Sequence, residues 1–294
     1  MELKFTKMHG CGNDYIYIDC TKECYEDLLD FSQISKDLCR LHFGIGADGI
    51  ILICKSKLAD AKMIMYNKDG SLGNMCGNGV RCVAKYLYDV LKIKKENLVI
   101  ETASGLKYIE IIAGNDSNGE KTAKSIKVNM GKPKFSPNLV PVNIENNLLK
   151  EVLNYEVNIG KYKYFLNCVS FGNPHCVLIF NEDINKIALE KIAKNFYEKS
   201  SFFPDGVNIE IVNIKNKNSI YARVWERGSE ETLACGTGAC ACFAVLKKLN
   251  LIDKERPLEV NLKGGRLLVF SERDEDEIFL SGSAKIVYTG IVKV

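Results

Sequence analysis

The feature that most constrains the fold is an internal repeat with an offset of about 160 residues. Met75-Cys76-Gly77-Asn78-Gly79 and Ala234-Cys235-Gly236-Thr237-Gly238 are two copies of one motif, and their cysteines lie 159 positions apart. Three further pairs recur in the same order: Gly12-Asn13 with Gly172-Asn173, Asp48-Gly49 with Asp205-Gly206, and Asn67 with Glu226. A period this long indicates a duplicated domain and not a solenoid.

The composition predicts a soluble globular protein with two full cores, because 46% of its 294 residues are hydrophobic and 26% are charged. The net charge is only +3 and the lysines are scattered, so no nucleic-acid partner is expected. No apolar run reaches the roughly 18 residues of a membrane span, and residues 1–7 lack a signal peptide's hydrophobic region. We therefore expect a cytoplasmic protein without a membrane partner, in which the twelve cysteines are reduced thiols.

Strand and helix patterns follow the repeat. The first half predicts strands at 3–8, 15–19, 49–54, 62–66, 98–102, 105–112 and 123–128, with helices at 33–41, capped by Ser32, and 78–91. The second half predicts strands at 163–170, 175–180, 206–214 and 220–225, helices at 184–197 and 237–250, and three or four final strands. Residues 131–147, which contain three prolines, are the predicted linker, and 115–120 the tip of a hairpin.

The strands are frequent and their connections short, which argues against a parallel sheet wound through crossover helices. The predicted fold class is therefore α+β, with two pseudo-symmetric domains that are each a mostly antiparallel sheet wrapped around a long central helix. We expect the first domain at residues 1–130 and the second at 131–277. The active site is expected in the cleft between the domains.

Both copies of the motif place a cysteine at the start of a predicted helix. The free amide groups and the macrodipole at a helix N-terminus favour negative charge, which can lower a thiol pKa from about 8.5 to roughly 3.5–7.5. The glycines at the third and fifth positions of each motif let the backbone approach a ligand closely and turn its amides toward an anion. Each copy thus predicts an activatable thiol beside a cradle for a carboxylate.

Two such thiols on opposite sides of one ligand suit a particular reaction. If one thiolate removes the α-proton of an amino acid and the opposing thiol delivers another, the stereocentre is inverted. The predicted reaction class is racemisation or epimerisation. No motif for pyridoxal phosphate is present, so no cofactor is expected, and stabilisation would come from preorganised amides and the exclusion of water.

The motif residues could also form a zinc site, a disulfide or a nucleotide-binding loop. A zinc site has little support, because no Cys-x-x-Cys pair is present and the chain has only three histidines. A disulfide between Cys76 and Cys235 is more plausible as a side reaction of two close thiols than as the main function. A nucleotide-binding loop is disfavoured, because the chain has neither a phosphate-loop lysine nor a G-x-G-x-x-G spacing.

Longer stretches around the motifs resemble one known family. They are His9-Gly10-Cys11-Gly12-Asn13-Asp14, Met75-Cys76-Gly77-Asn78-Gly79-Val80-Arg81-Cys82, Gly172-Asn173-Pro174-His175, Trp225-Glu226-Arg227-Gly228 and Ala234-Cys235-Gly236-Thr237-Gly238-Ala239. Together they resemble the motifs of the diaminopimelate epimerases, almost to the C-terminus. The resemblance implies a cofactor-independent interconversion of LL- and meso-2,6-diaminopimelate, on the path to lysine and, in many bacteria, to peptidoglycan.

The resemblance also implies roles for individual residues. Cys76 and Cys235 would be the acid/base pair, with His175 and Glu226 in support. The reacting carboxylate would lie on helix-terminal amides of Gly77, Asn78, Gly236 and Thr237. The remaining substrate groups would be bound by Asn13, Asn67, Asn173, Asn208, Glu226 and Arg227, of which Arg227 can grip a carboxylate by a bidentate contact. Tyr288 matches a position linked to dimer formation, so a homodimer is expected, and residues 278–294 would complete the first domain.

Structural explanations stay open for some of these residues. An asparagine after glycine, as at Asn13 and Asn173, is often only a turn residue. His175 could be a structural hydrogen-bonding group, and Glu226 beside Arg227 a surface ion pair. Asp69-Gly70-Ser71 is most simply a tight turn.

Two positions depart from the family pattern. Gly49 stands where many members carry glutamine, so a substrate contact there is doubtful. Glu230 replaces a glycine of the usual Arg-Gly-x-Gly-Glu-Thr, and a positive φ at that position would strain it.

The nearest alternatives are related enzymes and a non-catalytic relative. A proline or hydroxyproline racemase shares the two-cysteine logic, but that family typically has Cys-Gly-His where this chain has Cys76-Gly77-Asn78. A phenazine-biosynthesis-type isomerase would not need both cysteines. A redox or ligand-binding relative is disfavoured by the presence of both cysteines with Asn67, Glu226 and Arg227.

Overall fold

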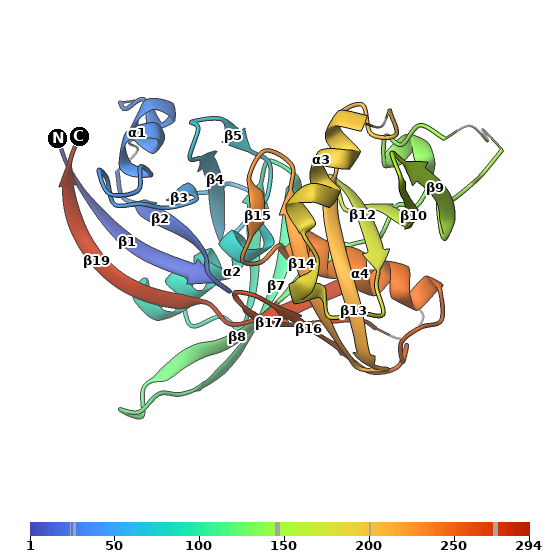
Figure 1. Ribbon diagram of the computed structural model, residues 1–294. Coiled ribbons are helices and arrows are strands. Elements are labelled where there is room, and N and C mark those ends of the chain that lie inside the picture. The colour runs from blue at the N-terminus through green and yellow to red at the C-terminus, as the bar shows by residue number, and fades with distance from the viewer. Residues whose placement is uncertain (24, 26–27, 145–147, 200, 273–275) are drawn as a thin grey trace. The chain divides into compact units, whose positions relative to one another are not determined.

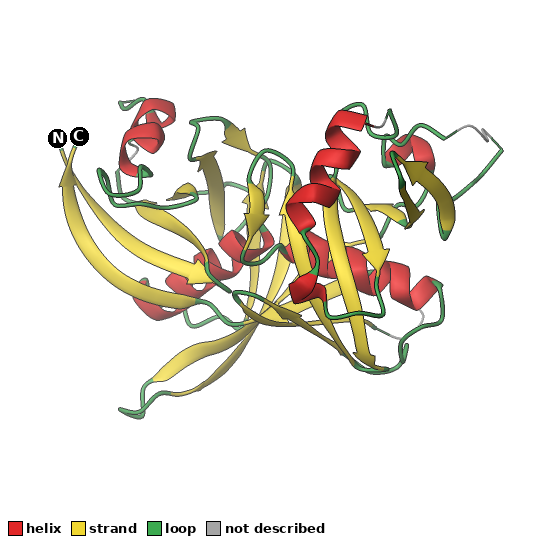
Figure 2. Ribbon diagram, in the orientation of Figure 1, coloured by secondary structure: helices red, strands yellow, loops and turns green. Residues whose placement is uncertain are grey.

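The computed structural model describes residues 1–23, 25, 28–144, 148–199, 201–272 and 276–294 (Figure 1). It divides into two compact units. Unit 1 contains Met1–Asn129 and Ser281–Val294, and unit 2 contains Met130–Leu280. Both are built of strands with a few helices, so the chain has a mixed α/β fold (Figure 2).

Unit 1 is built on strands that continue from one pairing to the next. Its elements are β1 (Glu2–Gly10), β2 (Asn13–Cys20), α1 (Phe31–Leu38), β3 (Gly49–Cys54), β4 (Ala61–Asn67), β5 (Leu72–Gly73), α2 (Gly77–Lys85), a π-helical turn η1 (Tyr86–Val90), β6 (Asn97–Thr102), β7 (Gly105–Asn115), β8 (Lys121–Gly131) and β19 (Lys285–Lys293). The C-terminal β19 pairs antiparallel with β1, which also pairs antiparallel with β2. Strand β3 pairs parallel with β2 and antiparallel with β4, and β4 pairs parallel with β6.

Unit 2 repeats much of this order. Its elements are η2 (Pro137–Leu139), β9 (Tyr155–Ile159), β10 (Tyr162–Leu166), β11 (Cys168–Ser170), β12 (Pro174–Ile179), η3 (Ile184–Lys186), α3 (Leu189–Lys199), β13 (Asn208–Asn216), β14 (Ser219–Glu226), β15 (Glu230–Thr232), α4 (Gly236–Lys248), β16 (Leu258–Leu262), β17 (Gly265–Ser271) and β18 (Ile278–Gly282). Strand β12 pairs antiparallel with β11 and parallel with β13. Strand β14 pairs antiparallel with β13 and β15 and parallel with β16.

Most of the strand pairs that the structure describes are antiparallel, as predicted, but each unit also contains parallel crossovers, which the sequence argument disfavoured. In unit 1, α1 connects the parallel strands β2 and β3, and α2 lies between the parallel strands β4 and β6. Unit 2 has the same two crossovers, through α3 between β12 and β13 and through α4 between β14 and β16. An eight-residue helix such as α1 suffices for a crossover, so short connections did not exclude parallel pairs.

The helices that follow the two cysteine motifs are buried in the cores of their units. Helix α2 packs against β1, β2, β6 and β7, and α4 packs against β11, β12, β13 and β17. In α4 Phe243, Val245 and Leu246 have no exposed surface. Burying each such side chain contributes roughly 1.5–3 kcal/mol, so the start of each helix is held on a rigid element.

Several predicted boundaries differ from the structure. The N-cap of α1 is Asp30 and not Ser32, because the Asp30 carboxylate accepts the amide of Gln33 at 3.2 Å. Regular α-helix ends at Lys85 and continues as a π-helical turn. The helix predicted from residue 184 begins at Leu189, and the short strands β5, β9 and β15 were not predicted.

The predicted linker belongs mostly to unit 2. Lys134 bridges to Ser170 of β11, and Val140 and Val142 lie in the unit 2 core. Residues 145–147 of the predicted linker lie outside the described residues. Among the helices that are described, none has the length and apolar character needed to cross a membrane.

Candidate active site

The first cysteine motif forms the start of α2. Cys76 is the N-cap residue, with extended backbone angles, and its sulfur accepts the amide of Gly79 at 3.2 Å. A Cβ at Gly79 would lie 2.7 Å from Ile51 Cδ1 and 3.3 Å from Cys76 Cβ, so glycine lets the helix start lie close to both side chains. The predicted placement of Cys76 at a helix N-terminus is therefore confirmed, and the residue is half-buried there.

Asn13 connects this thiol to its surroundings. Its Oδ1 accepts both the Cys76 thiol and Asn78 Nδ2, each at 3.2 Å. Its Nδ2 donates to Asp48 Oδ2 at 2.7 Å, and that carboxylate oxygen also accepts the amide of Asp14. The side-chain amide of Asn13 is therefore held through both its oxygen and its nitrogen, which goes beyond the role of a turn residue.

Two residues of this half that sequence reasoning did not assign are Arg81 and Tyr15. Arg81 is fully buried and donates to Gly77 O at 3.0 Å and to Asn78 Oδ1 at 2.8 Å, so it holds the first turn of α2. The buried Tyr15 hydroxyl hydrogen-bonds with Cys76 and with Asn13. Burial, followed by the charge of Cys76, raises the pKa of Tyr15 well above its usual value, so the phenol stays protonated and can donate to sulfur.

Asn67 is placed differently from Asn13. Its Nδ2 donates to Ser71 Oγ at 3.0 Å, and that hydroxyl donates to Asp69 Oδ1 at 2.6 Å. The amide of Ser71 donates to the same carboxylate. Asp69-Gly70-Ser71 is thus a tight turn, as the sequence indicates, and Asn67 is one of the residues that hold it.

The second cysteine motif repeats this geometry at the start of α4. Cys235 is the N-cap residue, and its sulfur accepts the amide of Gly238 at 3.4 Å. The hydroxyl of Thr237 lies 3.3 Å from the same sulfur and accepts Asn173 Nδ2 at 3.3 Å. The predicted helix N-terminus is therefore confirmed for Cys235 too. The thiol is buried, with 6% of the residue exposed.

Carboxylates distinguish the Cys235 half from the Cys76 half. The carboxylate of Glu226 accepts a hydrogen bond from Thr232 Oγ1. It also hydrogen-bonds with Cys235. Burial raises the pKa of the Glu226 carboxyl. Burial, followed by the charges of Glu226 and Glu210, raises the pKa of the Cys235 thiol well above its usual value. The macrodipole argument, which predicts a lowered pKa, is therefore outweighed at Cys235 when no substrate is bound.

The other predicted binding residues of unit 2 lie on neighbouring elements. Asn208 begins β13, and its Oδ1 accepts the amide of Arg227 at 2.8 Å. The exposed Arg227 donates from Nη1 to Asp205 O at 2.8 Å. His175 is fully buried on β12, and its Nδ1 lies 2.7 Å from Oε1 of Glu210, a residue that sequence reasoning missed.

Tyr288 is on β19, opposite Lys7 of β1, and its ring packs edge-to-face on Phe5 with centroids 5.9 Å apart. The residue is 45% exposed, so its ring is accessible on this strand within unit 1.

The two departures from the family pattern have structural consequences. A side chain at Gly49 would place its Cβ 2.1 Å from Tyr66 O and 2.9 Å from Tyr15 Cε1, so this backbone admits only glycine. Glu230 has φ +63°, which confirms the positive φ expected at the position of the missing glycine. A left-handed conformation costs a non-glycine residue about 1–2 kcal/mol, so the strain is real but small.

Glu230→Gly is expected to stabilise unit 2 by about 0.5–1 kcal/mol, because relief of the left-handed strain exceeds the entropy that glycine costs. Urea denaturation measures the change in unfolding free energy. The matched control is Glu231→Gly, which removes a carboxylate paired with Arg223 and Lys263 and should destabilise the protein. A loss of stability in Glu230→Gly would contradict the prediction.

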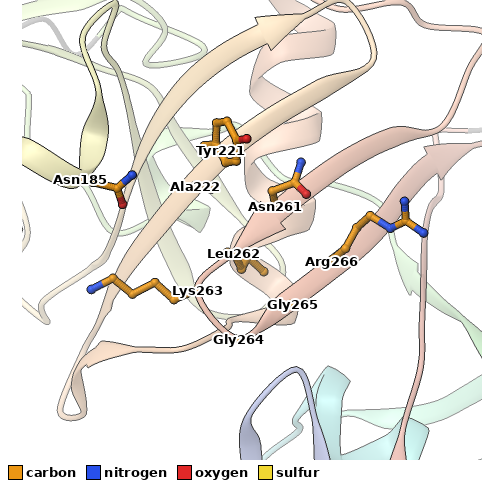
Figure 3. A pocket seen from close by; sticks show the side chains of 9 residues that line it. All are labelled: Asn185, Tyr221, Ala222, Asn261, Leu262, Lys263, Gly264, Gly265 and Arg266. Atoms are coloured by element: carbon orange, nitrogen blue, oxygen red, sulfur yellow. The ribbon is translucent and has the colours of Figure 1, made fainter.

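A separate pocket of about 560 Å³ lies on unit 2 (Figure 3). Its lining residues are Asn185, Tyr221, Ala222, Asn261, Leu262, Lys263, Gly264, Gly265 and Arg266, and none of the predicted site residues is among them. Its cations are paired, Lys263 with Glu231 at 2.6 Å and Arg266 with Glu259 at 2.8 Å. Because these carboxylates neutralise both cations, the pocket attracts an anion less strongly than its lysine and arginine alone would indicate. Within the described part of the chain no cluster of histidine, cysteine and carboxylate side chains is suited to a metal ion.

Comparison with known proteins identifies the family. The model of the family described as diaminopimelate epimerase matches residues 5–136 and 167–287. The chain belongs to the diaminopimelate epimerase family. Proteins named diaminopimelate epimerase from Halothermothrix orenii, Leptospira biflexa and Methanococcus maripaludis are 44%, 41% and 39% identical to it; each alignment covers 99–100% of both chains. As a member of the diaminopimelate epimerase family the chain is an isomerase, which confirms the resemblance seen in the motifs.

Solved structures share the fold of this family member at low identity. A hydroxyproline epimerase from Agrobacterium vitis aligns with TM-score 0.66 and 14% identity over 99% of this chain and 92% of that one. A phenazine biosynthesis protein of the PhzF family from Bacillus anthracis aligns with TM-score 0.65 and 17% identity over 100% of both chains. These likenesses show the fold alone. The fold is thus common to enzymes that the sequence motifs distinguish.

Proposed function

We propose that this protein converts LL-2,6-diaminopimelate to meso-2,6-diaminopimelate by proton transfer between Cys76 and Cys235, without a cofactor. The observation that carries the proposal is that two half-sites of one repeat each present a cysteine as the N-cap of a buried helix. Relatives that carry the name diaminopimelate epimerase support the substrate. In this proposal the product serves lysine biosynthesis and the formation of peptidoglycan precursors.

The proposed reaction begins with one sulfur as thiolate and the other as thiol. The thiolate removes the α-proton of the substrate, and the electron pair of the broken C–H bond is delocalised into the α-carboxylate. The opposing thiol then donates its proton to the other face of the α-carbon and becomes a thiolate. The proton count is unchanged and the thiols exchange roles, so the same pair serves both directions.

Helix-terminal amides are proposed to stabilise the carbanion. The first amides of a helix have no acceptor within the helix, and the amides of Gly77, Asn78, Gly236 and Thr237 occupy such positions. Amides fixed on buried helices need no reorganisation as negative charge develops on the carboxylate. Removing one such donor in other enzymes costs about 10²–10³ in turnover, so four of them can supply much of what an electron-sink cofactor would.

The remaining polar groups are proposed to bind the distal part of a substrate that carries two ammonium and two carboxylate groups. The oxygens of Asn13, Asn67, Asn173, Asn208 and Glu226 can accept from ammonium groups, and Arg227 can bind a carboxylate. Arg227 is exposed and donates to a backbone oxygen, so its guanidinium has further donors to offer. His175 supports the Cys235 half from within the core.

We also propose a cytoplasmic homodimer that uses the surface around Tyr288. Support comes from the 45% exposure of Tyr288 on β19 and from the resemblance of its position to the family's dimer position. Neither a nucleic acid nor a membrane is a partner in this proposal.

The test is solvent deuterium incorporation at the α-carbon of LL-diaminopimelate, with reduced protein and no added cofactor. The expected result is deuterium in the meso product, because the proton delivered comes from a thiol that exchanges with solvent. L-Proline and trans-4-hydroxy-L-proline are run alongside. Exchange only with the two prolines would move the enzyme to the racemase branch, and no exchange with any of the three would overturn the proposal.

A further inference from the structure

Glu210 is a buried carboxylate that no part of the proposed reaction yet uses. It lies on β13 with 1% of its surface exposed, inside an otherwise apolar run. Its Oε1 is 2.7 Å from Nδ1 of the fully buried His175. Its Oε2 and His175 Nε2 are among the described buried atoms that have no hydrogen-bond partner in the protein. Buried polar atoms without partners are costly, which indicates a function for this pair.

The carboxylate of Glu210 lies under the first turn of α4. A Cβ at Gly238 would be 2.6 Å from Glu210 Oε1, so the glycine after Thr237 makes room for the carboxylate. Gly238 is also the residue whose amide donates to the sulfur of Cys235. The position of Glu210 is thus linked to the thiol through one residue of the helix.

The internal repeat shows what the other half carries at this position. Tyr15 pairs with Gly49 and His175 with Asn208 in equivalent parallel pairs, so the strand register makes Gly49 the counterpart of Asn208 and not of Gly206, which the sequence repeat suggests. In this register Ile51 is the counterpart of Glu210. Gly79 approaches Ile51 as Gly238 approaches Glu210. The fold therefore tolerates an apolar side chain under a motif helix, and a buried charge is not needed for the architecture.

The contact with Glu210 determines the state of His175. The 2.7 Å contact between Nδ1 and Oε1 is a hydrogen bond whose direction depends on the tautomer of His175. A carboxylate without a proton can only accept, and such a contact selects the tautomer with the hydrogen on Nδ1. Nε2 is then the nitrogen that remains for other partners. His175 also acts electrostatically on Glu226, which hydrogen-bonds with Cys235.

We propose that Glu210 is a positioning residue of the reaction, which fixes the tautomer of His175 and places a buried negative charge beside Cys235, so that Cys235 enters the cycle as a protonated thiol. The inference rests on the proposed function, because it gives Glu210 a part in the chemistry of Cys235. It makes the two half-sites chemically unequal, since the counterpart of Glu210 is apolar and that of His175 is a phenol. One thiol is thereby prepared as the acid.

The groups that face this carboxylate are consistent with that role. His175 contacts it from β12. Its charge also acts on Glu226 of β14 and on Cys235 at the start of α4, as well as on Cys176, Cys242 and Tyr197. After burial itself, the charges of Glu226 and Glu210 raise the pKa of Cys235. Removing the Glu210 charge must therefore lower the pH at which Cys235 becomes a thiolate.

The test measures the rate of iodoacetamide alkylation of Cys235 from pH 6 to 10, by peptide mass spectrometry, in the full chain carrying Cys76→Ser. Glu210→Gln keeps the shape and the acceptor for His175 and removes the charge. The expected result is a midpoint at lower pH than in the parent protein. Glu210→Asp should keep the midpoint near that of the parent, and the exposed Glu182→Gln is the matched control in the same unit.

A midpoint unchanged in a folded Glu210→Gln protein would overturn the proposal, whereas a change only in the plateau rate at high pH would show altered access to the sulfur. If Glu210→Gln does not fold, ¹⁵N NMR of the parent protein decides, because the chain has only three histidines to assign. His175 found with hydrogen only on Nε2 at neutral pH would contradict the inference. Neither measurement uses diaminopimelate, so failure here is distinct from failure of the proposed function.

Discussion

Cys76→Ala and Cys235→Ala are each expected to lower turnover of diaminopimelate by about 10²–10⁴-fold, the contribution typical of a positioned acid or base. Each substitution removes one of the two groups that must exchange a proton across the α-carbon. The remaining thiol can still act on its own face, so slow exchange of the α-proton without inversion is the expected residual reaction. The measurements are the rate of conversion to the meso form and, separately, deuterium incorporation without conversion.

These substitutions are expected to leave the fold in place. An N-cap replaced by alanine costs about 0.5–2 kcal/mol, and the sulfur in each case accepts one amide of the following turn. Circular dichroism and urea denaturation verify that the variants are folded. Cys20→Ala is the matched control, because Cys20 is a buried cysteine at the end of β2 that belongs to neither cysteine motif. Its substitution should leave turnover unchanged. Substantial conversion by either single variant would rule out the two-base mechanism.

The two half-sites show what a repeat in the sequence can predict. The Cys-Gly-x-Gly motif fixes a helix start because the second glycine must lie close to the N-cap cysteine, and the structure has this contact in both units. Asn13 and Asn173 were predicted to be equivalent, and each hydrogen-bonds to the cysteine motif of its own half. Asn13 contacts Cys76 and Asn78, and Asn173 contacts Thr237. The helix start at each cysteine could therefore be predicted from spacing, whereas the contacts of the two asparagines are found only in the structure.

The residues that sequence reasoning missed contact the motifs from other elements or from a buried helix face. Glu210 stands in the apolar run Ile209–Val212, where a single charge was a signal for a buried partner, but the partner lies on another strand. Tyr15 looked like an apolar strand residue, although its hydroxyl meets Cys76. Parallel pairing of β12 with β13 brings Glu210 beside His175, and this pairing is decided by contacts distant in sequence. Patterns of alternation do not reveal which distant strand becomes the neighbour.

Arg81 presents the second large effect. It has no exposed surface, and its guanidinium donates to Gly77 O and Asn78 Oδ1 within the first turn of α2. A Cβ at Gly10 would lie 2.9 Å from Arg81 Nη2, so β1 also makes room for it. The side chain fills a space between the helix and the strand while its guanidinium donates to two oxygens of the first turn of α2.

Arg81→Met is expected to lower the free energy of unfolding by about 1–3 kcal/mol, because the buried Asn78 Oδ1 loses the guanidinium donor while methionine fills part of the volume. Turnover should fall as well, since Asn78 and Gly77 would no longer be held beside Cys76. Urea denaturation measures the stability, and the deuterium assay at a temperature where the variant is folded measures the second effect.

Arg81→Lys separates the two contributions of this side chain. Lysine keeps a charge and a long stem but lacks the planar fork that reaches both oxygens at once. We expect stability between that of the parent and that of Arg81→Met, with turnover closer to the methionine variant, because the first turn of α2 depends on simultaneous contact with Gly77 and Asn78. Parent-like turnover in a folded Arg81→Lys protein would show that charge alone suffices. In that case the position of Asn78 would depend on Asn13, whose Oδ1 it also contacts.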